Sequence, residues 1–319
     1  MRRFIIDTDT ASDDAAAIIM AALDPDVEIL GVTAVAGNIS VEQAAKNAKM
    51  TLEICGSDAP VYVGQPQPLF KERADTISVH GADGMGDAGI IHPQGTIAEG
   101  DAVHFILDTV KKYPDEIELV ALGPATNIAL AMMLDPGTMR HIKHIWSMGT
   151  PGLGVGNATP VAEFNVFIDP DAYAVMLKAV CPITIVGFDM CTATIGIDIR
   201  KVEELEKNGN AAGKFLARAT AKLREFNENA SGQHLADLPD ALAMAAAIWP
   251  DYVKASVQCY CTCMTTPGET YGQVIFYQKG RVYESMPKIG EYRAELVTAI
   301  DEELFVRRLM GLLTKKLNV

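Results

Sequence analysis

The chain has 319 residues, 49% of them hydrophobic and 21% charged, a balance typical of a folded globular protein rather than a disordered one. Its formal net charge of −14 argues against a nucleic-acid partner, because such partners are bound by clustered lysines and arginines. No apolar run approaches the roughly 18 residues of a membrane span, so we expect no membrane partner. Met1-Arg2-Arg3 leads directly into a short strand without the features of a secretory signal, which favours a cytoplasmic protein with a small neutral substrate.

Strand and helix patterns alternate over the first two hundred residues, which is typical of parallel βαβ units. The predicted strands are 4–6, 27–35, 116–122, 142–148 and 183–188, and the predicted helices are 15–23, 41–55, 128–134, 171–180, 202–228 (one or two surface helices) and 241–249. Residues 149–168 form the longest irregular stretch, and long loops in compact domains are usually functional. Strands at 253–264, 272–277 and 292–297 follow, closed by a helix at 301–317.

This pattern predicts an α/β fold in one domain over residues 1–319. We expect an open, mostly parallel, Rossmann-like sheet with helices on both faces and an antiparallel extension at its C-terminal end. Cys259, Cys261 and Cys263 alternate along one strand, so their thiols share a face. Zinc sites usually have wider spacing, and we interpret these cysteines as a buried apolar stripe.

The first predicted strand opens into Asp7-Thr8-Asp9-Thr10-Ala11-Ser12-Asp13-Asp14, which places four carboxylates within eight residues. Helix capping by Ser12, Asp13 and Asp14 is one explanation, but it leaves Asp7 and Asp9 unexplained. Acids at the C-terminal end of a buried strand lie where open α/β sheets bind ligands. A hard cation with oxygen ligands would offset the repulsion between them, so the motif favours a metal or sugar site.

Other polar residues also follow predicted strands and would share that edge of a parallel sheet. They are Asn38, Thr126, Asn127, Asn157, Glu163 and Asn165, and Asp240 starts a late helix. Taken singly, each is explained as a turn or capping residue, but together they form a set of oxygen ligands suited to Ca²⁺ or Mg²⁺.

In order and spacing, several motifs resemble the inosine-uridine nucleoside hydrolase family over essentially the whole chain. They are the Asp-rich segment 7–15, Ala36-Gly37-Asn38, His80-Gly81-Ala82-Asp83-Gly84, Gly123-Pro124-Ala125-Thr126-Asn127, Met148-Gly149 and Ala162-Glu163-Phe164-Asn165. The resemblance implies Ca²⁺-dependent hydrolysis of ribonucleosides to base and ribose by a homodimer or homotetramer. Such a reaction passes through an oxocarbenium-like state, which needs a nucleophilic water and nearby negative charge.

The resemblance also assigns residues. It implies one Ca²⁺ held by Asp9, Asp14, the Thr126 carbonyl and Asp240, with Asp9 also acting as the base that activates water. The implied sugar ligands are Asp13, Asn38, Asn165 and Asp240 for the ribose diol, Asn157 and Glu163 for the 5′ hydroxyl, and Met148 beneath the ring.

The chain departs from the family at Thr10-Ala11, where Pro-Gly is usual, at Thr150, where a glycine is usual, and at Pro239. Members that have a His or Trp before the last metal-type aspartate use it on the departing base, and Pro239 can do neither. His80 and His234 are then the candidate catalytic acids, because an ordinary imidazole titrates near ~6.5.

Two other functions fit parts of the sequence. Asp-x-Asp after a first strand also describes a Mg²⁺-dependent, haloacid-dehalogenase-like phosphohydrolase, although Ala11 replaces the threonine expected there and no lysine is suitably placed. The altered loop and Pro239 also allow a nucleoside-binding homologue with impaired catalysis.

Overall fold

Nine strands form one sheet in the computed structural model, which describes residues 1–192, 194–283 and 290–316. The strands are β1 (Arg2–Thr8), β2 (Val27–Ala34), β3 (Val61–Val63), β4 (Ile117–Ala121), β5 (His144–Met148), β6 (Ile183–Val186), β9 (Val253–Cys263), β10 (Val274–Gln278) and β11 (Ala294–Ile300). Their order is β10-β9-β11-β6-β5-β4-β1-β2-β3. A separate antiparallel pair joins β7 (Ile197–Asp198) to β8 (Leu235–Ala236).

The order of β3, β2, β1, β4, β5 and β6 confirms the Rossmann-like prediction, and neighbouring strands in this run are parallel. Strand β9 runs antiparallel to both of its neighbours, as expected for the C-terminal part. The last strand, β11, is different, because it inserts beside β6 and pairs with it in parallel. The C-terminal extension is therefore mixed rather than purely antiparallel.

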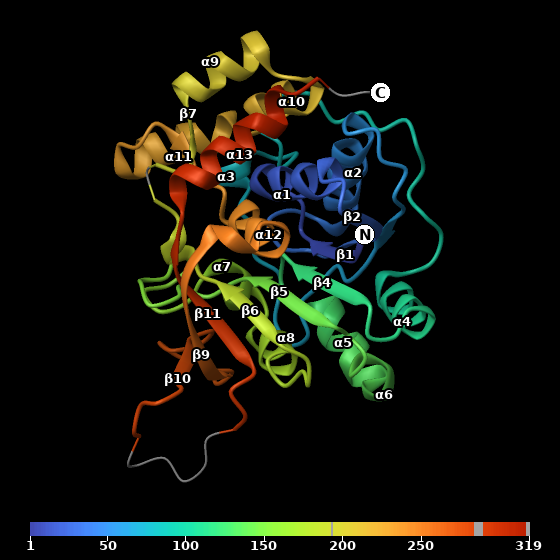
Figure 1. The fold of residues 1–319 in the computed structure, drawn as a ribbon, viewed down its shortest axis with the longest axis vertical. Helices are drawn as coiled ribbons and strands as arrows, with labels where there is room; N and C mark the ends of the chain where they lie inside the picture. The colour runs from blue at the N-terminus through green and yellow to red at the C-terminus, as the bar shows by residue number, and fades with distance from the viewer. Residues whose placement is uncertain (193, 284–289, 317–319) are drawn as a thin grey trace.

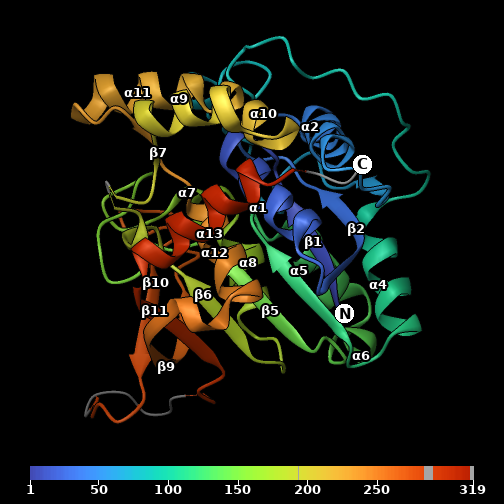
Figure 2. The same ribbon diagram turned by 45° about the horizontal axis from the view of Figure 1, so that its top comes forward.

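Helices cover both faces of the sheet, as predicted (Figures 1 and 2). One face carries α1 (Ser12–Leu23), α2 (Val41–Ile54), α10 (Ala211–Ala219), α12 (Pro239–Ile248) and α13 (Glu302–Thr314). The other carries α4 (Ala102–Lys112), α5 (Thr126–Leu134), α6 (Pro136–Met139) and α8 (Pro170–Met176). Side-chain alternation along β1 serves both layers, since Phe4 and Ile6 enter one core and Ile5 the other.

The remaining helices lie around the C-terminal edge or outside the two layers. They are α3 (Ile77–His80), α7 (Phe164–Ile168), α9 (Ile199–Asn208), α11 (Ala221–Ser231) and the short 3-10 turns at Phe188–Met190 and Pro250–Tyr252. No helix in the described ranges is long and apolar enough to cross a membrane.

Several local predictions need correction. The stretch 202–228 contains three helices rather than one or two, and α10 is largely buried rather than on the surface. The irregular stretch 149–168 ends in the short helix α7, and β3 has no counterpart in the prediction. Helix α5 starts at Thr126, two residues early, and Leu317 at the predicted end of the last helix lies outside the described residues. The cysteine stripe is confirmed for Cys259 and Cys261, which are free and buried in the core, whereas Cys263 is free but only half-buried.

Candidate active site

A cavity of about 200 Å³ opens at the C-terminal edge of the parallel strands. Its walls come from the segments that follow β1, β2, β5 and β6, together with α3, α11 and the start of α12. The lining residues are Asp13, Asn38, Thr76, Val79, His80, Met148, Asn157, Glu163, Phe164, Asn165, Phe188, Leu223, Phe226, Asn227, Asp237, Pro239 and Asp240. The cavity therefore combines a carboxylate-rich part with an apolar and aromatic part.

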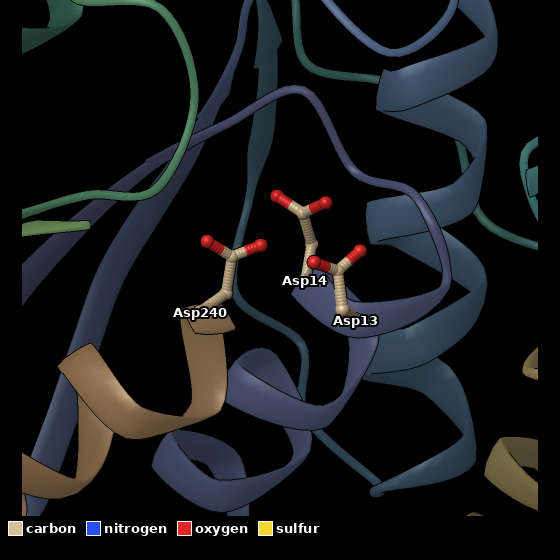
Figure 3. A group of neighbouring side chains, drawn as sticks. All are labelled: Asp13, Asp14 and Asp240. Carbon is tan, nitrogen blue, oxygen red and sulfur yellow. The ribbon is translucent and has the colours of Figure 1, made fainter. Parts of the chain in front are cut away.

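Three carboxylates meet at the deep end of this region. One oxygen each from Asp13, Asp14 and Asp240 lies within 4.8 Å of the other two. Figure 3 shows why: Asp13 and Asp14 stand in the first turn of α1, Asp240 stands in the first turn of α12, and the carboxylates project into the same space. The two helix N-termini offset part of the negative charge, since their free N–H groups attract anions.

Asp9 lies beside this group and is fixed by the backbone. Its Oδ2 accepts a hydrogen bond of 2.6 Å from the Asn38 amide. Asp14 accepts from the Thr8 hydroxyl at 2.5 Å and from the Ala11 amide at 2.8 Å. Space around Asp9 is tight, because a Cβ added to Gly37 or Gly123 would collide with its carboxylate.

Among the residues that the structure describes, three buried oxygens of the cluster have no hydrogen-bond partner: Asp9 Oδ1, Asp13 Oδ1 and Asp240 Oδ1. Buried polar groups are normally paired, so each bare oxygen requires an explanation. Burial is the main cause that raises the pKa of Asp9, Asp14 and Asp240, and their mutual repulsion adds to it. For Asp14 the pKa rises to about 8. These donors fit a hard divalent cation, which would accept the bare oxygens and neutralise the repulsion.

Side-chain hydrogen bonds fix Thr126 and Asp7 in place. Thr126 is the first residue of α5, and its hydroxyl donates a hydrogen bond of 2.7 Å to Asp169. Asp7 accepts from the Thr33 hydroxyl and from the Asn127 side chain, and it lines no part of the cavity. The structure thus brings Asp14 and Asp240 of the predicted metal set together, adds Asp13 to them, and leaves Asp7 as a support.

The predicted sugar ligands line the cavity together. Glu163 is buried at the N-terminus of α7, where its carboxylate accepts from the amides of Asn165 and Val166, and burial raises its pKa to about 7. The Asn165 side chain donates to the Leu122 carbonyl at 2.6 Å and lies 3.4 Å from the Met148 sulfur. Asn157 accepts from the Phe164 amide, which ties the long loop to this helix.

Comparison with known proteins shows which protein family has this fold. Residues 4–307 match the family described as inosine-uridine preferring nucleoside hydrolase. The chain belongs to this family. A relative, the pyrimidine-specific ribonucleoside hydrolase RihB of Escherichia coli (strain SE11), is 33% identical over 284 residues, or 88% of each chain. Membership makes the chain a ribonucleoside hydrolase.

Two solved structures of nucleoside hydrolases have closely similar folds. The plant nucleoside hydrolase PpNRh1 matches with a TM-score of 0.92 at 27% identity and covers 99% of both chains. The purine-preferring ribonucleoside hydrolase from Gardnerella vaginalis matches with a TM-score of 0.87 at 28% identity over 98% of both chains. A relative named for purines thus shares this fold, and a relative named for pyrimidines matches in sequence.

The two candidate histidines of this nucleoside hydrolase differ in burial and in their position relative to the cavity. The His80 side chain is only 8% exposed and lines the cavity. Its Nδ1 lies 2.8 Å from the Ser12 hydroxyl and 3.9 Å from Asp13. The His234 side chain is 67% exposed and pairs with Glu228 at 3.0 Å, and it is absent from the cavity wall. The structure does not bring His234 to the site.

Sequence reasoning missed most of the apolar wall of this family member. Leu223 and Phe226 of α11, Val79 of α3 and Phe188 after β6 line the cavity, and so do Thr76, Asn227 and Asp237. The spacing of Leu223, Phe226 and Asn227 puts them on one face of α11, a pattern that was visible in the sequence. Thr76 holds its segment in place by donating to the Asn38 side chain at 2.6 Å.

Proposed function

We propose that this chain uses one Ca²⁺ to hydrolyse the N-glycosidic bond of ribonucleosides, releasing free base and ribose. The observation that carries the proposal is the set of buried carboxylate oxygens of Asp9, Asp13 and Asp240, without hydrogen-bond partners in the described chain, beside a cavity with a carboxylate-rich part and an apolar part. Buried anions without hydrogen bonds or counterions are costly, and a bound cation removes that cost. Family membership supports the reaction class.

The ion would be held by Asp9, Asp14, Asp240 and the Thr126 carbonyl, a set of oxygens that suits Ca²⁺. When bound, Ca²⁺ would supply the positive charge that lets water lose a proton near neutral pH. Asp9 would accept that proton, since the Asn38 amide holds one of its oxygens and the other has no hydrogen-bond partner among the described residues.

The polar residues that line the cavity would bind the sugar. Asp13, Asn38, Asn165 and Asp240 would hold the ribose diol, Asn157 and Glu163 the 5′ hydroxyl, and Met148 would pack beneath the ring. All seven side chains line one cavity, which supports this assignment. Their negative charge would stabilise the positive charge that develops on the sugar as the bond to the base breaks.

The base would then lie against the apolar wall, where Val79, Phe188 and Phe226 are available for stacking and contact. Assembly as a homodimer or homotetramer and a cytoplasmic location remain predictions from the sequence and the resemblance.

The direct test is ribose release. Purified protein supplied with Ca²⁺ should release ribose from at least one of inosine, adenosine, guanosine, uridine and cytidine, measured by a reducing-sugar assay. Tight nucleoside binding without any ribose would instead indicate an impaired homologue. Release of phosphate from nucleotides with no release of base would contradict the proposed reaction.

We keep His80 as a proposed catalytic residue at the boundary between sugar and base, because it lines the cavity beside Asp13. His80→Ala should lower kcat/KM at least about tenfold, the scale of one lost polar contact to the transition state. His234→Ala should stay within about twofold, as is usual for exposed positions away from a site. Equal effects of the two substitutions on ribose release would contradict this distinction.

A further inference from the structure

The departing base is a poor leaving group, and its loss as an anion is slow unless a proton is supplied to it. Pro239 lines the cavity at the start of α12 and has no proton to give. His80 is engaged on the sugar side, where its Nδ1 meets Ser12 and faces Asp13. The proton would then come from another side chain on the base side of the cavity, near the apolar wall against which the base would lie. The inference below rests on the proposed function.

Asp237 lies on that side. It occupies the short segment between β8 and α12, and it lines the cavity. The Asn227 side chain of α11 donates a hydrogen bond of 3.0 Å to Asp237 Oδ2 and another of 2.9 Å to the Leu235 carbonyl. These two bonds fix the carboxyl group against the face of α11 that also presents Leu223 and Phe226 to the cavity.

We propose that Asp237, positioned by Asn227, is the acid that protonates the departing base. It stands next to the apolar wall against which the base would pack. Asn227 engages one of its two oxygens, so the carboxyl group can be held in place while it donates from the other. Two hydrogen bonds from a single amide make Asn227 a positioning residue for this acid.

The surroundings raise the pKa of Asp237 above its ordinary value. Burial is the main cause and the charge of Asp13 adds to it, whereas the hydrogen bond from Asn227 lowers it. Cys191 also faces Asp237, and burial together with the nearby carboxylates raises the pKa of its thiol, so it stays neutral. Within the described chain no lysine or arginine lines the cavity, so no cation there would favour the carboxylate. A raised pKa is the direction that a carboxyl group needs if it is to act as a general acid.

Bonds and protons balance in the proposed hydrolysis. The bond between the anomeric carbon and the base nitrogen breaks, and its electron pair goes to the base. The Asp237 proton moves to the base, and the water oxygen bonds to the anomeric carbon. Asp9 takes the proton that this water loses, and both carboxyl groups then return to their starting states by proton exchange with solvent.

The test compares two substrates with the Ca²⁺-loaded full chain. Nucleosides need a proton on the base, whereas the nitrophenolate of p-nitrophenyl β-D-ribofuranoside leaves without one. Asp237→Asn should lower kcat on the best nucleoside by about 10² or more, the usual contribution of a general acid. The same variant should hydrolyse the nitrophenyl riboside within about threefold of the parent rate, because that reaction does not use the acid.

Asn227→Ala should slow nucleoside hydrolysis less than Asp237→Asn and should also spare the nitrophenyl riboside. Glu225→Gln, an exposed position on α11 outside the cavity, is the matched control and should change neither rate. Equal slowing of both substrates by Asp237→Asn would overturn the proposal, since a structural defect acts on both. An unchanged nucleoside rate would overturn it too. Failure of the parent protein to release ribose from either substrate would refute the proposed function instead.

Discussion

Asp9→Asn should lower kcat for ribose release by at least about 10³-fold, because it removes both the proposed base and a metal ligand. Asparagine keeps the shape of the side chain and can still accept the hydrogen bond from the Asn38 amide. Glutamate would not serve as the test, because the carboxylate of Asp9 already packs against Gly37 and Gly123. The measurement is steady-state ribose release, with thermal unfolding followed by circular dichroism.

The metal-free Asp9→Asn protein should unfold at no lower temperature than the parent. Asp9 is buried beside Asp13 and Asp14, whose charges oppose its ionisation, so a neutral amide removes a repulsive contact. The variant should also bind Ca²⁺ more weakly, since a neutral oxygen replaces a carboxylate. Loss of activity together with loss of the folded state would leave the assigned role of Asp9 unsupported.

Asp7→Asn is the matched control, because Asp7 is also a buried aspartate, only two residues away, and burial rather than a neighbouring carboxylate raises its pKa. It accepts hydrogen bonds from Thr33 and Asn127, so its substitution should lower the unfolding temperature. Activity at a temperature where the variant is folded should stay within about tenfold of the parent, since Asp7 would touch neither metal nor substrate. Equal loss of kcat in the two variants would contradict the division of roles between Asp7 and Asp9.

The sequence predicted the meeting of the carboxylates better than it predicted the apolar wall of the cavity, and the physical reason is local. Asp9, Asp13 and Asp14 fall within six residues, directly after a strand and at the start of a helix. Their meeting with Asp240 needs only that α1 and α12 begin at the same edge of the sheet. The parallel sheet imposes this on α1, which follows β1, but α12 follows β8 of the separate antiparallel pair, so the place of Asp240 was expected from the family resemblance rather than from the strand pattern alone.

The base side depends on packing that local pattern does not specify. The apolar residues of α11 are typical of any amphipathic helix, and periodicity alone does not distinguish a face that covers a core from one that covers a cavity. The same holds for His80 and His234, which both stand close to glycines in the sequence. Only the folded chain shows that α3 brings His80 inward and that His234 pairs with Glu228 in solvent.

Removal of the divalent cation should abolish ribose release and lower the unfolding temperature by at least about 5 °C, because a ligand that binds only the folded state stabilises it. Dialysis against a chelator followed by addition of Ca²⁺ should restore both. Elemental analysis of the active protein should find about one Ca²⁺ per chain, the number that one carboxylate cluster would hold. Full activity in metal-free protein would contradict the proposed site.

The stabilisation by Ca²⁺ should increase from pH 5 to pH 8. In the metal-free chain, burial raises the pKa of Asp14 to about 8 and also raises the pKa values of Asp9 and Asp240. An ordinary aspartate in the unfolded chain titrates near ~4, so the folded state binds more protons between these values. The stability that these protonated groups contribute is complete below pH ~4 and is lost as the pH rises through about 8.

Bound Ca²⁺ removes this loss, because it stabilises the ionised carboxylates and competes with their protons. The measurement is the difference in unfolding temperature between Ca²⁺-loaded and metal-free protein at each pH. Groups outside the site titrate equally in both forms, so their effect drops out of this difference. Asp14→Asn should flatten the pH dependence of this difference, since it removes the group whose pKa is raised to about 8. A difference that is the same at pH 5 and pH 8 in the parent protein would mean that these carboxylates do not hold the ion.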